Sequence, residues 1–177
     1  MPGNSVLVVS DTSPISSLAR MGWLEWLHER WGQVLVPEAV WRELSCLRDT
    51  RALATIEAAR AAGWVEVRVI AESALLHQLQ ESLDAGEAEA IALAHETGAS
   101  WLLMDELDGR SAAAIHGLRI TGTLGTILWA KVAGKIDSVR GALLELRDGI
   151  RFFVSDDLIE ELAHEAGEPS KFDDLRG

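Results

Sequence analysis

The chain has 177 residues, with 28 acidic and 16 basic side chains and a formal charge of −12. This length predicts a single domain, and the apolar content of 48% is that of a packed globule rather than of a disordered chain. The single cysteine, Cys46, excludes a disulfide framework and a Cys-rich zinc site. We expect a cytoplasmic protein, because the sequence has neither a membrane-length apolar run nor the basic n-region of a signal peptide.

The negative charge is unevenly distributed along the chain. Residues 152–177 hold eight acidic and two basic side chains, a charge of −6, and residues 1–151 carry the other −6. Acidity by itself counts against a nucleic-acid partner, because phosphate contacts need Lys and Arg. The positions of the acids within residues 1–151 therefore decide whether this objection holds.

Short apolar runs alternate with helical patterns. The expected strands are 6–9, 34–36, 64–69, 101–104 and 118–121. The expected helices are 15–27 with an interruption at Gly22, 37–44, 52–62, 74–83, 87–96, 110–116, 124–133 and 138–146, followed by a helix in the acidic tail. Residues 64–69 alternate between apolar and polar side chains, which is typical of a strand at the edge of a sheet.

Strands separated by helices predict an α/β fold with a parallel sheet. We therefore expect a three-layer α/β/α sandwich with a central, mainly parallel, twisted sheet. The expected domain spans residues 1–150, and residues 151–177 form an acidic helical tail that packs on this domain or extends from it.

Four acidic residues occupy comparable positions in this pattern. Asp11 and Asp105 directly follow two of the apolar strands, whereas Glu43 and Glu87 lie early on helices. In open α/β sheets, ligands bind beyond the carboxyl ends of the strands. Gathered carboxylates repel one another unless a cation neutralises them, and oxygen ligands suit Mg²⁺ or Mn²⁺. The joint arrangement thus predicts a divalent-metal site.

Each acid also has an ordinary structural explanation. Asp11 could cap a helix, and Glu43 could be a solvated helix residue paired with a neighbouring arginine. Glu87 could be a first-turn acid that faces the helix dipole. Asp105 and Asp108 could be turn and capping residues. No P-loop or His-Glu-x-x-His pattern is present, which counts against nucleotide binding by a P-loop and against a zinc hydrolase.

Four segments carry a resemblance to a known family. They are Val8-Val9-Ser10-Asp11-Thr12-Ser13-Pro14, Val36-Pro37-Glu38-Ala39-Val40-Trp41-Arg42-Glu43, Gly86-Glu87-Ala88-Glu89-Ala90-Ile91-Ala92-Leu93-Ala94 and Leu102-Leu103-Met104-Asp105-Glu106. In this order and spacing the chain resembles PIN domains over about residues 5–150. Gly122-Thr123-Leu124-Gly125 is similar to a segment of a largely uncharacterised bacterial and archaeal subfamily.

The resemblance implies a set of roles for the acids. Asp11, Glu43, Glu87 and Asp105 match the catalytic acidic cluster of the family, which binds one or two Mg²⁺ or Mn²⁺ ions. Asp11 and Asp105 are expected as core metal ligands, Glu87 as a second ligand or water orienter, and Glu43 as a peripheral ligand. Asp108 matches a further acid that many members carry.

The resemblance leaves one choice open. The subfamily often has an acid directly after the fourth position, which here is Glu106, so the sequence does not decide which of Asp105, Glu106 and Asp108 binds the metal. Asp84 is a spare candidate one helical turn before Glu87, with Gly86 as a possible break between them.

Other residues are candidates for contacts with the substrate. Thr12 and Ser13 match the polar position beside the first acid of the family. Arg110 is a candidate for holding an RNA phosphate.

The function that the resemblance implies is a metal-dependent endoribonuclease, the toxin of a VapBC-type toxin–antitoxin pair. The implied partners are RNA, a cognate antitoxin and a second copy of the chain. A tryptophan-bearing helix pair, 21–31 with 41–47, would suit the homodimer or antitoxin interface. The alternatives are a regulatory or binding protein with little nuclease activity and a DNA or structure-specific nuclease.

Overall fold

The computed structural model describes residues 6–169, so residues 170–177 of the predicted acidic tail lie outside the described part. The chain forms two compact units, one up to Thr123 and one from Leu124 onward. The predicted boundary at residue 150 separates the expected domain from the acidic tail, and it stays a prediction. Within residues 6–169, no helix has the length and apolar character needed to cross a membrane.

The first unit contains a five-stranded sheet. Its strands are β1 (Val8–Ser10), β2 (Val34–Pro37), β3 (Val65–Arg68), β4 (Trp101–Leu103) and β5 (Ile120–Thr121). The strand order is β3-β2-β1-β4-β5, and every neighbouring pair is parallel. The expected parallel sheet is therefore confirmed, and so is the expected position of β3 at an edge.

Seven helices accompany these strands in the described part of the first unit. They are α1 (Thr12–Met21), α2 (Glu25–Trp31), α3 (Glu38–Ser45), α4 (Thr50–Ala61), α5 (Ala74–Gln80), α6 (Ala85–Thr97) and α7 (Leu107–Ile115). Gly22 ends α1 with a φ of +76°, as the expected interruption requires. Gly86 lies inside the first turn of α6, so the possible break there was wrong.

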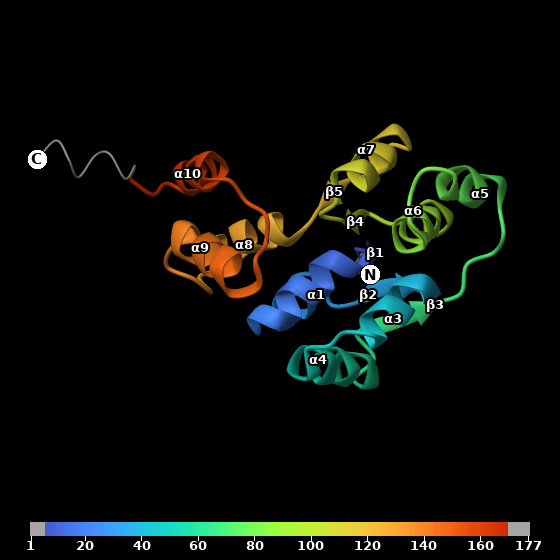
Figure 1. Cartoon of the computed structure of the whole chain (residues 1–177), viewed down its shortest axis with the longest axis horizontal. Helices are drawn as coiled ribbons and strands as arrows, with labels where there is room; N and C mark the ends of the chain where they lie inside the picture. Colours follow the sequence, from blue (N-terminus) through green and yellow to red (C-terminus); the bar gives the residue numbers. More distant parts are fainter. Residues whose placement is uncertain (1–5, 170–177) are drawn as a thin grey trace, which may run out of the picture. The chain divides into compact units, whose positions relative to one another are not determined.

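The sheet separates two apolar cores, because successive side chains of a strand point to opposite faces. Val8, Val34 and Leu103 belong to the core under α1–α4. Val9 and Leu102 belong to the core under α5–α7. The expected three-layer α/β/α arrangement is thereby confirmed, with strands between the two groups of helices (Figure 1).

The tryptophans of the predicted helix pair are partly buried. Trp23, Trp26, Trp31 and Trp41 all pack against the core under α1–α4. The rings of Trp23 and Trp26 stack with centroids 4.9 Å apart. These residues contribute to packing inside the first unit, and the homodimer that they suggested stays a prediction.

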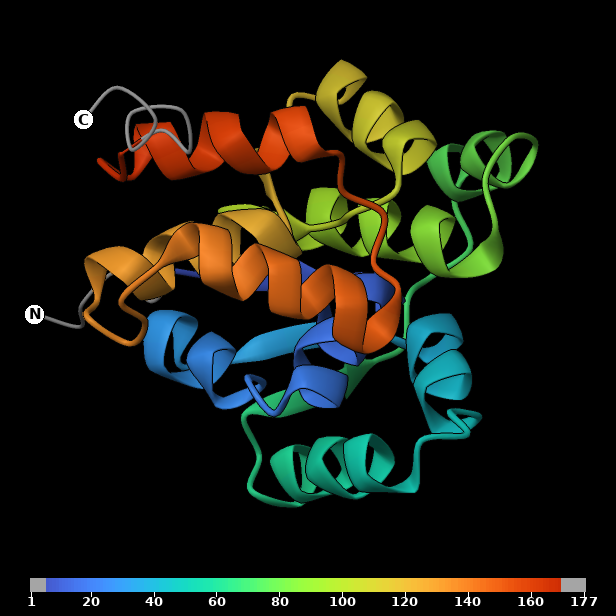
Figure 2. The same cartoon turned by 60° about the vertical axis from the view of Figure 1, so that its left-hand side comes forward.

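The second unit is helical in its described part. Its helices are α8, which begins at the end of the first unit (Thr123–Val132), α9 (Val139–Ile150) and α10 (Asp156–Glu165). Helices α9 and α10, orange and red in Figure 2, pack against each other. The helical C-terminal tail expected from the sequence is therefore present over the described residues.

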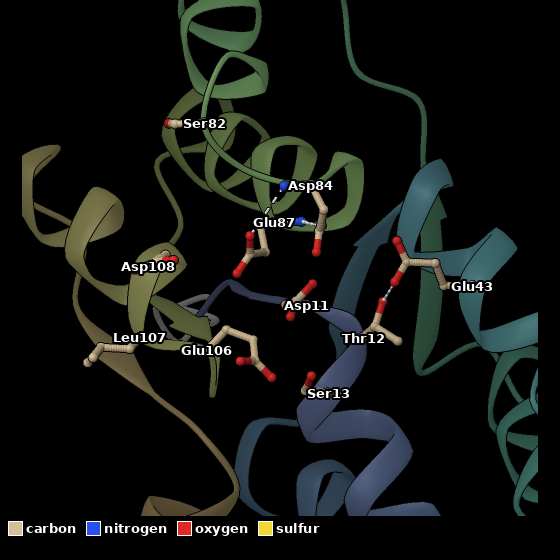
Figure 3. A pocket seen from close by; sticks show the side chains of 10 residues that line it. All are labelled: Asp11, Thr12, Ser13, Glu43, Ser82, Asp84, Glu87, Glu106, Leu107 and Asp108. Carbon is tan, nitrogen blue, oxygen red and sulfur yellow. Dashed lines mark hydrogen bonds between the residues drawn. The ribbon is translucent and has the colours of Figure 1, made fainter.

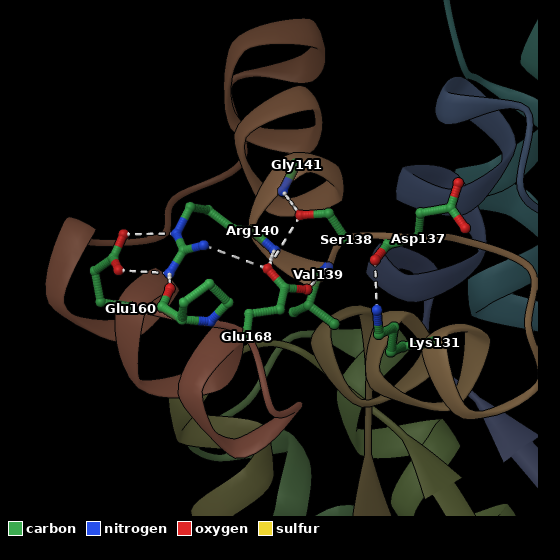
Figure 4. Close-up of polar contacts among 9 residues, drawn as sticks. Lys131, Asp137, Ser138, Val139, Arg140, Gly141, Glu160 and Glu168 are labelled. Carbon is green, nitrogen blue, oxygen red and sulfur yellow. Dashed lines mark hydrogen bonds and ion pairs between the residues drawn. The ribbon is translucent and has the colours of Figure 1, made fainter. Parts of the chain in front are cut away.

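A polar cluster joins Glu168, which follows α10, to the beginning of α9 (Figure 4). The Glu168 carboxylate accepts hydrogen bonds from the backbone N–H groups of Val139 and Arg140 and from the Ser138 hydroxyl. The Arg140 guanidinium donates two hydrogen bonds to Glu160, with Nε–Oε1 at 3.0 Å and Nη2–Oε2 at 2.8 Å. Glu168 thus places a negative charge at the N-terminus of α9, where the helix dipole favours it.

We predict that Glu168→Ala lowers the free energy of unfolding by about 1–2 kcal/mol, because the first N–H groups of α9 lose their acceptor. Chemical denaturation monitored by circular dichroism measures the change. The exposed Glu161 of α10 offers a matched control, since Glu161→Ala removes the same charge without touching α9. Equal stabilities of the two variants would contradict the capping role of Glu168.

Candidate functional site

A cavity of about 600 Å³ opens beyond the carboxyl ends of the central strands. Figure 3 shows the ten residues that line it: Asp11, Thr12, Ser13, Glu43, Ser82, Asp84, Glu87, Glu106, Leu107 and Asp108. The chain runs from β1 outward through β2 and β3 and then returns to β4 on the other side of β1. The cavity therefore lies at the switch point of the sheet, where ligands bind in open α/β folds.

Asp11 occupies the centre of this edge. Its backbone N–H donates to the Leu103 carbonyl at 2.9 Å, which continues the β1–β4 pairing by one residue. Only 3% of Asp11 is exposed. Burial, and to a smaller extent the charges of Asp84, Glu43 and Glu87, raises the pKa of its carboxyl to about 7. Asp11 precedes α1 but makes no side-chain capping bond, so capping does not account for it.

Glu87 combines a local role with a place in the cavity. The Asp84 Oδ1 accepts from the Glu87 backbone N–H at 2.9 Å, and the Glu87 Oε2 accepts from the Asp84 backbone N–H at 3.3 Å. This reciprocal capping box starts α6. Burial first, and the Asp84 charge second, raise the pKa of Glu87. Glu87 is therefore both an acid in the first turn of α6 and a residue that lines the cavity.

Glu43 is held by Thr12 and lies close to Gly86. The Thr12 hydroxyl donates to the Glu43 Oε2 at 2.5 Å, which links α3 to the start of α1 (Figure 3). A Cβ atom on Gly86 would lie 2.7 Å from the Glu43 Oε1, so the absence of a side chain at Gly86 leaves room for this carboxylate. Arg42, the arginine next to Glu43 in the sequence, pairs instead with Glu89, with its Nη2 3.7 Å from the Glu89 Oε1.

The three acids at the end of β4 divide between two environments. Glu106 and Asp108 line the cavity, whereas Asp105 is not among the residues that line it. The Asp105 Oδ1 accepts from the Thr123 backbone N–H at 2.8 Å, and its Oδ2 accepts from the Thr123 hydroxyl at 2.6 Å. Burial is the largest influence on Asp105 and raises its pKa, while the Thr123 bonds and the Arg110 charge lower it.

The residues expected to contact the substrate differ in their positions. Thr12 and Ser13 line the cavity. Arg110 does not, because its Nη1 donates to the Met104 carbonyl at 2.8 Å. Sequence reasoning missed Ser82 and Leu107. Ser82 stands two residues before the cap of α6, and this proximity was the one signal that could have indicated it.

The charged residues that line the cavity are all acidic. Six of the ten lining residues are acidic, and among them there is no Lys, Arg or His. Oxygen donors of this kind suit Mg²⁺ and Mn²⁺ and do not suit a thiolate-bound metal. In the described part of the chain, no three Asp, Glu, His or Cys side chains are close enough to hold one ion directly. Binding in this arrangement would involve one or two direct carboxylate ligands, with the other acids contacting the ion through bound water, the mode that Mg²⁺ favours.

Comparison with known proteins adds an independent finding. A family model described as a PIN domain matches residues 7–168. This match covers the whole sheet, every residue that lines the acidic cavity, and the described helices of the second unit. No curated protein matches the chain.

We predict that the metal-free protein becomes less stable as the pH rises from about 4 to about 7. In this window the folded chain keeps a proton on Asp11 that the unfolded chain has released. Each pKa unit corresponds to about 1.4 kcal/mol, so the decrease attributable to Asp11 is about 4 kcal/mol. Denaturation in EDTA at a series of pH values measures it.

Asp11→Asn, which removes the titrating carboxyl group, gives a second test of the same prediction. Because Asn is uncharged, the variant is expected to be more stable than the wild type at pH 8 without metal, and less dependent on pH. Glu57→Gln, which changes an exposed acid of α4, serves as the control and is expected to follow the wild type. A wild-type profile as flat as that of Asp11→Asn would contradict the prediction.

Proposed function

The chain belongs to the PIN-domain family, whose members are generally nucleases, and we propose that this protein is a metal-dependent endoribonuclease. The observation that carries the proposal is the cavity at the β1–β4 switch point, with six carboxylates and no basic residue among those that line it. Carboxylates gathered in this way repel one another unless a cation neutralises them, and two of the six, Asp11 and Glu87, are also buried. The expected cofactor is Mg²⁺ or Mn²⁺.

We assign the metal-binding roles to the acids that the cavity brings together. Asp11 and Glu87 are buried and supply the central carboxylates. Glu43, fixed by Thr12, supplies a peripheral one. Glu106, which follows β4, and Asp108, in the first turn of α7, line the same cavity and are further candidates. A divalent ion at this position would lower the pKa of a bound water and stabilise the charge on the leaving 3′ oxygen.

The hydroxyl groups of the cavity wall offer contacts to the substrate. Thr12, Ser13 and Ser82 line the same cavity as the acids. A hydroxyl can donate to a phosphate oxygen without adding positive charge. Because the wall has no basic residue, we expect RNA affinity to be modest and to depend on the bound metal, which offsets the repulsion between carboxylates and phosphate.

We further propose that the protein is the toxin of a VapBC-type pair, acts in the cytoplasm, and associates with a cognate antitoxin and with a second copy of itself. The resemblance of its acidic segments to those toxins supports this role. The acidic cavity has the charge that a basic segment of a partner protein would complement.

Cleavage assays test the nuclease proposal. The purified full-length protein is incubated with total RNA and with single-stranded DNA, in EDTA, in Mg²⁺ and in Mn²⁺. We expect cleavage of RNA with either metal and none in EDTA. Asp11→Asn and Glu87→Gln should each reduce the rate by about 100-fold or more, because each removes a carboxylate that binds the metal.

Glu57→Gln is the matched control, since it neutralises an acid outside the cavity and should retain the wild-type rate. Metal-dependent cleavage of DNA alone would instead identify a DNA nuclease. Cleavage by Asp11→Asn at the wild-type rate, or no cleavage under any condition, would overturn the proposal. The second result would favour a binding or regulatory role.

The toxin role has its own test. Induced expression of the wild type in a bacterial host should stop growth, and expression of Asp11→Asn should not. A short reading frame encoding a DNA-binding protein beside the gene should relieve the arrest when it is co-expressed. Unimpaired growth with an active enzyme would contradict the toxin role but not the nuclease proposal.

A further inference from the structure

Two consecutive acids at the end of β4 have different surroundings. Glu106 is exposed and lines the acidic cavity. Asp105 is only partly exposed as a residue, and both of its carboxylate oxygens accept hydrogen bonds from Thr123. The sequence resemblance alone left open which of these acids binds the metal.

We call the two hydrogen bonds between Asp105 and Thr123 the brace. One carboxylate oxygen accepts from the Thr123 backbone N–H and the other accepts from the Thr123 hydroxyl, so these bonds join two segments that are distant in sequence. Gly122 makes the approach possible, because a Cβ atom there would collide with the Asp105 Oδ1 and lie 2.9 Å from the Met104 carbonyl oxygen. The Arg110 Nη1 donates a hydrogen bond to the same carbonyl at 2.8 Å.

The backbone explains why only one of the two acids reaches the cavity. Glu106 has extended dihedral angles, with φ −67° and ψ 135°, before α7 begins. Successive side chains of an extended segment point in opposite directions. When Asp105 is turned toward Thr123, Glu106 is directed to the cavity, where it is seen in Figure 3.

We propose that Asp105 is a positioning residue that braces the end of β4 against Thr123, the last residue of the first unit, and that Glu106 is the acid from this strand end that faces the metal. This inference rests on the proposed metal-dependent function. It chooses between acids that the resemblance left open, and it gives a positioning role to Asp105, which the resemblance matched to a core metal ligand.

Isosteric variants separate the two roles. Asp105→Asn keeps the brace, since the Asn oxygen can accept from the Thr123 N–H and its amide can donate to the Thr123 hydroxyl, but it removes the charge. Glu106→Gln likewise keeps the shape and removes the charge at the cavity. The measurement is Mn²⁺ binding to the full-length protein by titration calorimetry, with Asp11→Asn as the reference for a lost ligand.

We expect Glu106→Gln to weaken Mn²⁺ binding by about tenfold or more and Asp105→Asn to change it by less than about threefold. Asp105→Ala and Thr123→Val break the brace and should weaken Mn²⁺ binding by about tenfold, as removal of a supporting contact does at metal sites. Thr123→Ser keeps the hydroxyl and should restore the wild-type affinity. A merely structural role would not give this pattern in metal affinity.

The possible failures are distinguishable. Mn²⁺ binding that is weakened as strongly by Asp105→Asn as by Glu106→Gln, or Glu106→Gln with wild-type affinity, overturns the inference while the metal site stands. Wild-type Mn²⁺ affinity in Asp11→Asn overturns the proposed function instead. The brace is then judged by thermal unfolding without metal, in which Asp105→Ala and Thr123→Val must lower Tm and Asp105→Asn must not.

Discussion

The pairing of β1 with β4 is the contact on which the site depends. These strands are far apart in the chain, yet Ser10 lies opposite Leu103, and the Asp11 N–H bonds to the Leu103 carbonyl. The pairing places the residues that follow both strands at one edge of the sheet. In the order β3-β2-β1-β4-β5, β2 and β3 lie on one side of this pair and β5 lies on the other. The connections that leave β1 and β4 therefore diverge, and the acidic cavity occupies the space between them.

The surrounding structure keeps the acidic side chains of the cavity together despite their mutual repulsion. Two apolar cores fix the sheet from both faces, and the helices that they hold carry Glu43 and Glu87 to the edge. Small residues allow close approach: a Cβ atom on Gly86 would lie against Glu43, and one on Gly109 would lie 2.9 Å from the Glu87 Oε1. Such an arrangement costs stability in the absence of a cation, which is a common property of sites that are built for binding.

Several residues near the cavity have both a structural and a chemical role. Asp84 and Glu87 cap the N-terminus of α6 and also line the cavity. Thr12 begins α1 and holds the Glu43 carboxylate. Because capping and site formation use the same side chains, a substitution at one of these positions changes local helix stability and cavity charge together. Isosteric amide variants are therefore more informative here than alanine variants.

Local patterns in the sequence were enough to predict the main elements and the parallel sheet. Apolar runs indicate buried strands, Gly22 indicates a helix end, and the alternation of 64–69 indicates an edge strand, because each depends on the residue itself and its immediate neighbours. The same patterns were not sufficient at Gly86, which was expected as a possible break. Gly86 lies inside α6 because the capping box of Asp84 and Glu87 starts the helix before it. Its missing side chain leaves room for the Glu43 carboxylate.

The directions of the side chains were decided only by the tertiary structure. Asp105 follows its strand as Asp11 does, but Thr123 turns its carboxylate away, and Arg110 is bound to the Met104 carbonyl rather than directed to the cavity. Asp84 joins the cavity as the cap of α6. Periodicity specifies which face of an element a residue occupies, whereas the partner that its polar atoms meet belongs to another segment of the chain. The acidic composition of the site was therefore readable in the sequence, and the identity of the acids that face one another depended on the fold.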